Sequence, residues 1–293
     1  MQGWPVIHSW TTSSHPRSLD HQQGVYTSWQ LFATEFGHVF VVHMEGKSGI
    51  NILQAINKYF NEIGVPLHLI CDQVQEQVRG DARLLFNKDL CHVIDLEKWT
   101  PVLNRAERAI KILKDGWKRD ISDTNYPMVF WCYCIERRAS VINATIRVNH
   151  LLEKQLLHSR LTVQLIDISS ICEFGWYNRV MYRAEGHKFT LQHQNLGRAL
   201  GPSNNDVSAM SQWVITGTGD IMPIQMLRQL TPYERSIPVM IKRMKGFDDN
   251  TKKKYGYSMN ISTYKSLSIN MYPEHDNEPS NADSGEVGDI HVP

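Results

Sequence analysis

Two acidic residues, Asp72 and Glu107, have the type and surroundings that a metal-dependent reaction needs. Asp72 ends the short apolar run VPLHLICD, which is the pattern of a buried strand that ends at a site. Glu107 stands near the start of a long segment with helical spacing. Carboxylates from a strand end and a helix start can bind one divalent ion, because Mg²⁺ prefers oxygen ligands and keeps several waters. A buried strand can equally end in a solvated aspartate, so a magnesium site is one of two interpretations.

Three lysines follow Glu107 on the same side of the expected helix. Lys111, Lys114 and Lys118 continue from Glu107 at steps of four, three and four residues. Such a column can neutralise the phosphates of a nucleic-acid backbone, which releases counterions without reading the base sequence. The same column also fits an ordinary solvated helix face, with one Glu–Lys pair worth about 0.2–0.5 kcal/mol. The residues alone leave both interpretations open.

An apolar stripe on this segment must hold the helix against a core. Its members recur at helical spacing, and they are Ala106, Ile110, Leu113, Trp117 and Ile121. Upstream, GVYTSWQLFATEFGHVFVVHM indicates two strands around a glycine turn, and SGINILQAINKYFNEIG indicates a helix. Antiparallel strands followed by alternating strands and helices predict an α/β layered domain that ends near residue 150.

The remainder of the chain changes in composition along its length. Residues 151–171 have no clear pattern and are expected to connect two domains. Residues 172–235 alternate aromatic and β-branched runs with turn signals, which predicts a small β-rich module. Residues 236–293 become polar, with few large apolar side chains near the end, so we expect a largely disordered tail.

Composition limits the classes of protein to which the chain can belong. Its 31 basic and 30 acidic residues give a net charge of +1, so only local patches can attract a polyanion. Five cysteines without framework spacing argue against a disulfide-stapled secreted domain. Neither a signal peptide nor a run of roughly 20 apolar residues is present. We therefore expect an intracellular protein with no membrane partner.

Several blocks of sequence, taken in order, resemble the integrase of copia-type retrotransposon polyproteins. The resemblance extends from about residue 6 to about residue 232. Thr-Pro-x-x-Asn-x-x-Glu-Arg is moderately specific alone and becomes highly specific in this order with the other blocks. The blocks are CDQVQEQ (71–77), TPVLNRAER (100–108), FWCYCIERRASVINATIR (130–147), FGWY (174–177) and LGRALGPSNNDVSAMSQWVI (196–215).

The resemblance implies a fold and an activity. The fold is α/β, with a ribonuclease-H-like catalytic core (a mixed sheet with flanking helices) in residues 1–150 and a small SH3-like β module after it. The activity is metal-dependent nicking and strand transfer, which joins the ends of retroelement DNA to target DNA. Related integrases act as homo-multimers on DNA, and a nuclear location follows from that role. The chain would be a fragment of a polyprotein of a transposable element.

The resemblance also assigns residues. Asp72 and Glu107 match the second aspartate and the glutamate of a site with three carboxylates that holds Mg²⁺ or Mn²⁺. Asn104 matches the asparagine of the Thr-Pro block, and Lys111 and Lys114 stand where related integrases place lysines that contact DNA. Lys118 continues the same column and joins the expected nucleic-acid-binding residues.

The first aspartate of the family's site has no counterpart in this chain. The segment VIHSWTTSSHPRSL puts Trp10 at its position, and an indole cannot ligate Mg²⁺. Asp20 and Glu35 are the nearest acids, but neither fits the register. Because losing one member of a cooperative catalytic set costs orders of magnitude in rate, we expect DNA binding with impaired strand transfer.

Two alternatives to this impaired integrase stay open. One is an active polynucleotidyl transferase that uses a shifted third acid. The other is a non-catalytic interaction protein derived from a retroelement. The sequence therefore leaves open whether the chain is an enzyme.

Overall fold

The structure is a computed structural model, and it describes most of the first 256 residues. These residues belong to one unit, Met1–Ser258, while a second unit, Met259–Pro293, lies outside the described residues. The described ranges are 7–12, 18–19, 25–72, 81–96, 105–124, 126–144, 146–148, 154–156, 168–183, 194–203 and 211–256.

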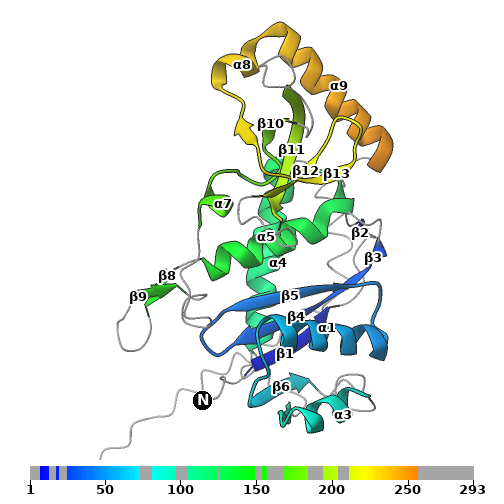
Figure 1. Cartoon of the computed structure of the whole chain (residues 1–293), viewed down its shortest axis with the longest axis vertical. Helices are drawn as coiled ribbons and strands as arrows, with labels where there is room; N and C mark the ends of the chain where they lie inside the picture. Colours follow the sequence, from blue (N-terminus) through cyan, green and yellow to red (C-terminus); the bar gives the residue numbers. More distant parts are fainter. Residues whose placement is uncertain are drawn as a thin grey trace, which may run out of the picture. The chain divides into compact units, whose positions relative to one another are not determined.

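A mixed five-stranded sheet forms the first half of the fold, with the strand order β5-β4-β1-β6-β7 (Figure 1). Strand β4 is antiparallel to both β1 and β5, whereas β6 is parallel to both β1 and β7. The strands are β1 (Ile7–Thr12), β4 (Ser28–Thr34), β5 (Val39–Met44), β6 (His68–Asp72) and β7 (His92–Leu96). The mixed sheet confirms the α/β class expected from the sequence.

Helices cover this sheet on both faces. All seven residues of β4 are buried, which requires cover on each side because successive side chains of a strand point in opposite directions. Helices α1 (Gly49–Glu62) and α3 (Asp81–Lys88) enclose one core cluster, in which Phe32 stacks on Tyr59 with 4.6 Å between ring centroids. Helix α4 (Arg105–Thr124) contacts β1 and β4, and α5 (Trp131–Asn143) contacts β5.

A second five-stranded sheet follows, and all of its strand pairs are antiparallel, in the order β13-β12-β11-β10-β14. A side chain at Gly197 would clash with the neighbouring strand, because a Cβ there would lie 2.6 Å from Val214 Cγ1 and 2.9 Å from the Ile215 carbonyl oxygen. The strands are β10 (Arg179–Arg183), β11 (Gln194–Pro202), β12 (Gln212–Ile215), β13 (Ile221–Ile224) and β14 (Leu227–Gln229).

Short elements complete the described residues up to position 236. They are β2 (Ser18–Leu19), β3 (Val25–Tyr26), the 3₁₀ turn η2 (Met128–Phe130), β8 (Ile146–Val148), β9 (Lys154–Leu156), α7 (Ser169–Cys172) and α8 (Pro232–Ser236). Strands β2 and β3 form one antiparallel pair, and β8 and β9 form another. None of the described helices is both long enough and apolar enough to pass through a lipid bilayer.

The expectation of disorder from residue 236 onward is wrong for Pro238–Tyr255, which form the 18-residue helix α9. Met244 and Phe247 of this helix are buried, and Asp248 forms ion pairs with two arginines of the second sheet. These inward-facing residues hold α9 against the second sheet, although most residues of the helix are polar. Residues 257–293, the rest of the expected tail, lie outside the described residues.

Candidate functional site

Asp72 is the last residue of β6, as the sequence predicted, and Trp10 lies in β1. In the parallel pairing of these strands, Ser9 is the partner of Cys71. Trp10 and Asp72 each come one residue later, so the two positions are adjacent on neighbouring strands. The side chains of both residues lie outside the described ones. At the backbone level, a tryptophan position therefore stands beside the position of the aspartate that the resemblance assigns to a metal site.

Glu35 lies too far along the sheet to replace a ligand at position 10. It follows β4, whose last residue Thr34 is paired with Ile7, whereas Trp10 is paired with Leu31. Four steps along the chain, from Leu31 to Glu35, thus separate the two places, roughly 13 Å at the usual rise per residue of a strand. Asp20, the other nearby acid, lies outside the described residues. Glu35 therefore does not occupy the place on β4 that is paired with Trp10, although its carbonyl oxygen accepts a hydrogen bond from Arg105 at the start of α4.

Glu107 lies in the first turn of α4, and its side chain is half-buried. The helix begins at Arg105, whose guanidinium donates a hydrogen bond to the carbonyl oxygen of Glu35. Asn104 precedes the helix and lies outside the described residues. Among the side chains that are described, no three histidines, cysteines or carboxylates gather closely enough to hold a metal ion.

The donor set does not fit the three-carboxylate magnesium site that the resemblance implies. The resemblance assigns Asp72 and Glu107 as two of the three carboxylates, and the strand position beside Asp72 carries a tryptophan, whose indole cannot ligate Mg²⁺. Two-metal chemistry at a phosphodiester depends on a fixed set of oxygen ligands for both ions. No catalytic step through a metal follows from these residues.

The lysine column on α4 is only partly open to solvent. Lys111 and Lys118 are exposed, and Lys114 is half-buried. Burial, followed by the charge of Lys118, lowers the pKa of Lys114. Lys118 also pairs with Asp115 across 4.0 Å. Of the three lysines, Lys111 is the one whose charge is most available to an external phosphate.

The apolar stripe of α4 is confirmed, because all five of its predicted members are buried. The sequence interpretation missed Asp120, which lies on the same side of the helix and is 7% exposed. Its carboxylate accepts a hydrogen bond of 2.6 Å from Nε of Arg138 on α5 and another of 3.2 Å from the thiol of Cys134. Its position three residues after Trp117 was the available signal, because that spacing places an acid within the stripe.

Neighbouring polar groups lock α4 to α5 around Asp120. Burial, followed by the charge of Asp120, raises the pKa of the Cys134 thiol. The indole nitrogen of Trp117 donates to the hydroxyl of Tyr126, whose pKa burial raises as well. A Cβ at Gly116 would lie 3.2 Å from Cδ of Arg138, so a glycine lets the arginine pass close to the helix. These contacts fix the direction in which the lysine column points.

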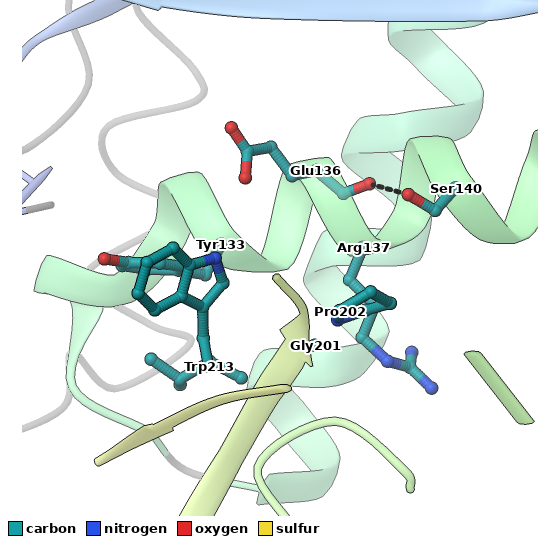
Figure 2. A pocket seen from close by; sticks show the side chains of 8 residues that line it. Tyr133, Glu136, Arg137, Ser140, Gly201, Pro202 and Trp213 are labelled. Atoms are coloured by element: carbon teal, nitrogen blue, oxygen red, sulfur yellow. Dashed lines mark hydrogen bonds between the residues drawn. The ribbon is translucent and has the colours of Figure 1, made fainter. Parts of the chain in front are cut away.

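A small hollow lies between α5 and the second sheet (Figure 2). Tyr133 and Trp213 meet there with 6.1 Å between ring centroids, and the hydroxyl of Ser140 donates to the carbonyl oxygen of Glu136. Its empty space is about 200 Å³ including open solvent, below the ~300–1,000 Å³ of small-molecule sites. The hollow is therefore a seam between packed elements rather than a substrate pocket.

Comparison with known proteins finds similarity only among solved structures, since no family model and no curated protein sequence matches the chain. A chain of the simian T-cell lymphotropic virus intasome, in complex with the PP2A regulatory subunit B56 gamma, is 15% identical with a TM-score of 0.43, over 78% of this chain and 80% of that one.

Two catalytic core domains are similar over about half of the chain. The HTLV-2 integrase core in complex with magnesium is 15% identical with a TM-score of 0.40, over 54% of this chain and 97% of its own. The BIV integrase core is 12% identical with a TM-score of 0.42, over 55% of this chain and 95% of its own. Similarity of this size shows nothing about the activity of this chain.

Proposed function

We propose that this chain is a DNA-binding protein of the integrase type, related to copia-type retrotransposon integrases and impaired in strand transfer. Its mixed sheet with helices on both faces suits a ribonuclease-H-like core, and its five short antiparallel strands suit an SH3-like module. The observation that carries the proposal is the adjacency of positions 10 and 72. The resemblance matches Trp10 to the family's first aspartate and Asp72 and Glu107 to its other two acids, and the strand register that sets positions 10 and 72 side by side supports this match.

DNA is the partner that the lysine column fits. Exposed lysines on a fixed helix can neutralise backbone phosphates, and this contribution does not require a metal. Retroelement ends and target DNA are the proposed ligands, and a homo-multimer on DNA and a nuclear location accompany them. Mg²⁺ or Mn²⁺ would bind weakly at Asp72 and Glu107, because one carboxylate is missing from the family's set.

The salt dependence of DNA affinity tests this proposal. Fluorescence anisotropy with a labelled duplex should show the logarithm of the binding constant falling linearly with the logarithm of salt concentration. Lys111→Ala should reduce the magnitude of that slope by about one, because it removes one phosphate contact. Lys114→Ala should reduce it less, because Lys114 is half-buried.

Lys58→Ala provides a matched control for the α4 variants. Lys58 lies on α1, at the other face of the sheet, and already pairs with Glu62 across 3.8 Å. Its replacement should leave affinity and slope unchanged. If DNA affinity of the wild-type chain did not depend on salt, the proposal would be overturned. If Lys111→Ala and the wild type had the same salt slope, Lys111 would not contact DNA.

A further inference from the structure

The outward face of α9 carries four lysines, Lys242, Lys245, Lys252 and Lys253, which we call the α9 lysine face. Three inward residues of α9 are buried against the second sheet, and they are Met244, Phe247 and Thr251. At 3.6 residues per turn, Lys242 and Lys253 fall opposite these three residues, and Lys245 and Lys252 fall on the adjoining flank of the helix. All four are exposed, and among the described residues none of them has an ion-pair partner.

The acid that could neutralise this face is turned inward. Asp248 accepts hydrogen bonds from Arg179 at 2.7 Å and from Arg198 at 2.6 Å. Burial alone would raise the pKa of Asp248, but the hydrogen bonds and charges of Arg198 and Arg179 outweigh it and lower the pKa. Asp248 therefore stays ionised on the sheet side, and Asp249 is the one acid left among the four lysines.

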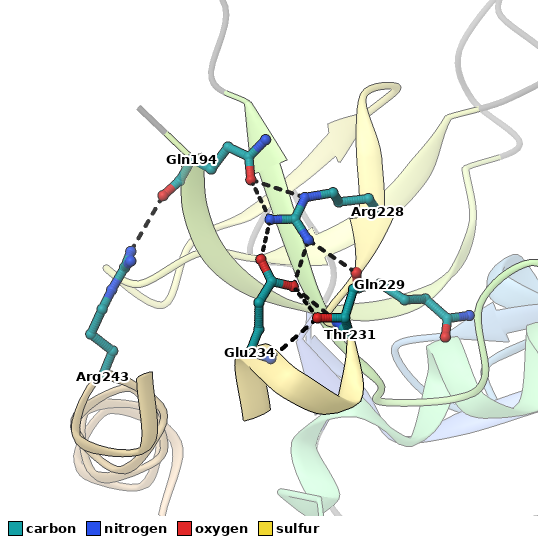
Figure 3. A network of polar contacts seen from close by, with 6 residues as sticks. All are labelled: Gln194, Arg228, Gln229, Thr231, Glu234 and Arg243. Carbon is teal, nitrogen blue, oxygen red and sulfur yellow. Dashed lines mark hydrogen bonds and ion pairs between the residues drawn. The ribbon is translucent and has the colours of Figure 1, made fainter. Parts of the chain in front are cut away.

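Contacts near the start of α9 hold its orientation (Figure 3). Arg228 binds both carboxylate oxygens of Glu234 at 2.6 and 2.7 Å, and Glu234 also caps α8 through Thr231. Arg243 of α9 donates to the carbonyl oxygen of Gln194 at 3.3 Å. Arg243 is therefore occupied at the sheet, and it does not belong to the outward face.

The end of α9 is held in the same way. Lys254 pairs with Asp220 across 2.8 Å, and the hydroxyl of Tyr255 donates to the carbonyl oxygen of Gly219. The ring of Tyr255 also packs edge-on against Phe130, with 4.8 Å between centroids. Because both ends of α9 are fixed, its four lysines project from a helix that is already ordered. Binding therefore does not have to order the helix.

We propose that the α9 lysine face is a second contact surface for the phosphate backbone of duplex DNA, which extends the DNA-binding function proposed above and rests on it. Lys242 and Lys253 are eleven residues apart, roughly 16 Å along the helix axis. Duplex DNA carries one negative charge per ~1.7 Å of its axis, so the face spans several phosphates. Ammonium groups bind phosphates as point charges and impose no sequence preference.

The chemistry of the face favours DNA over an anionic membrane. Membrane-surface helices combine a basic face with apolar side chains that enter the lipid. Here the buried apolar side chains in this part of the helix, Met244 and Phe247, are turned toward the sheet. Val239 and Ile241, at the start of the helix, are exposed, but from Lys242 to Lys253 the residues that share the outward face are Gly246 and Asp249. Apolar side chains that could enter lipid are therefore confined to one end of the face.

The test replaces all four lysines of the face by alanine in the full-length chain. Anisotropy with a random-sequence duplex should give a salt slope smaller by about 3–4, at about 0.9 per phosphate contact, and a loss of affinity of roughly 10–100-fold at low salt. A second variant with arginine at the four positions should keep the wild-type slope, because it keeps the charges.

A matched control removes four positive charges from the surface around α1 and α3 instead. Lys47, Lys58, Arg83 and Lys88 are exposed on or near α1 and α3, and their joint replacement by alanine changes net charge by the same amount. This control should keep most of the wild-type slope. Circular dichroism and thermal melting check that α9 remains folded in each variant.

The outcomes separate this inference from the proposed function. If the alanine variant and the matched control lose slope equally, binding follows net charge and the α9 lysine face is not a contact surface. If the alanine variant keeps the wild-type slope, the inference is overturned while DNA binding by the chain stands. If the wild-type chain shows no salt-dependent binding, both fail. Loss of binding to anionic vesicles, with DNA binding unchanged, would assign the face to membranes instead.

Discussion

Helices α4 and α9 are built on the same plan and differ in what they leave exposed. Each presents lysines on one side and turns one aspartate inward to arginine. Asp120 of α4 binds Arg138 of the neighbouring helix, and Asp248 of α9 binds Arg179 and Arg198 of the second sheet. On α4, Lys114 is half-buried and Lys118 pairs with Asp115, whereas the α9 lysine face has four exposed lysines without a described ion pair.

The comparison shows that a lysine column in the sequence says little about how much charge is available. The α4 column directly follows Glu107 and the Thr-Pro block, so the sequence favours it as the DNA-binding surface. Burial and a local acid then reduce what it can offer to a phosphate. The sequence of α9 suggests a polar tail, yet the fold turns Asp248 inward and leaves four exposed lysines with Asp249 as the one acid among them.

The largest expected effect concerns the inward acid of α4. Asp120→Ala leaves the guanidinium of Arg138 without its partner inside the interface between α4 and α5. Breaking a buried ion pair from one side costs about 3–5 kcal/mol, so urea denaturation should show a loss of that order in the free energy of unfolding. Asp115→Ala on the exposed side of the same helix should change it by less than about 0.5 kcal/mol. Equal effects would mean that Asp120 does not anchor α4.

The inward acid of α9 should matter less, because the side chain of Asp248 is 26% exposed. We expect Asp248→Asn to cost about 2 kcal/mol, between the values for surface and buried pairs. The loss should be local, with faster amide exchange and proteolysis within α9. Asp249→Asn, one residue away and exposed, is the matched control and should exchange like wild type. Similar exchange in both variants would show that the arginine pairs do not hold the helix.

The smallest expected effect is a pH dependence at the start of the α8–α9 segment. Hydrogen bonds from Arg228, followed by the backbone N–H of Thr231, lower the pKa of Glu234 from 4.5 to about 2. Because the folded-state pKa lies below the usual value, this contact stabilises the segment above pH 4.5 and is lost as pH falls toward 2.

Amide exchange of residues 231–236, followed from pH 6 to pH 2, measures this effect. Protection in the wild-type chain should decrease over the acidic part of that range, after correction for the intrinsic exchange rate. Glu234→Gln should start with lower protection and lose most of the pH dependence. Indistinguishable profiles would mean that the Arg228–Glu234 contact does not fix the start of α9.

Local patterns predicted much of the core. The apolar stripe of α4 is a periodic signal within one helix, and the end of β6 at Asp72 follows from a short apolar run with an acid after it. Both are properties of neighbouring residues. The mixed sheet followed from the order of strands and helices together with the family resemblance.

The features that the sequence interpretation missed depend on partners far along the chain. Asp248 forms hydrogen bonds with Arg198 and Arg179, which precede it by 50 and 69 residues. The local sequence of α9 therefore does not predict that the helix packs on the second sheet. Asp120 likewise depends on Arg138, 18 residues later, on another helix. The adjacency of positions 10 and 72 is set by strand register, which periodicity within a single strand cannot supply.

A strand-transfer assay tests the central claim most directly, namely that this chain holds DNA without joining it. The full-length protein is mixed with labelled duplexes that carry retroelement ends and with a target duplex, in Mg²⁺ and separately in Mn²⁺. Binding is measured on the same samples. We predict salt-dependent binding and no joined product above the level of Glu107→Gln. Joined product from the wild-type chain that Glu107→Gln abolishes would contradict the account.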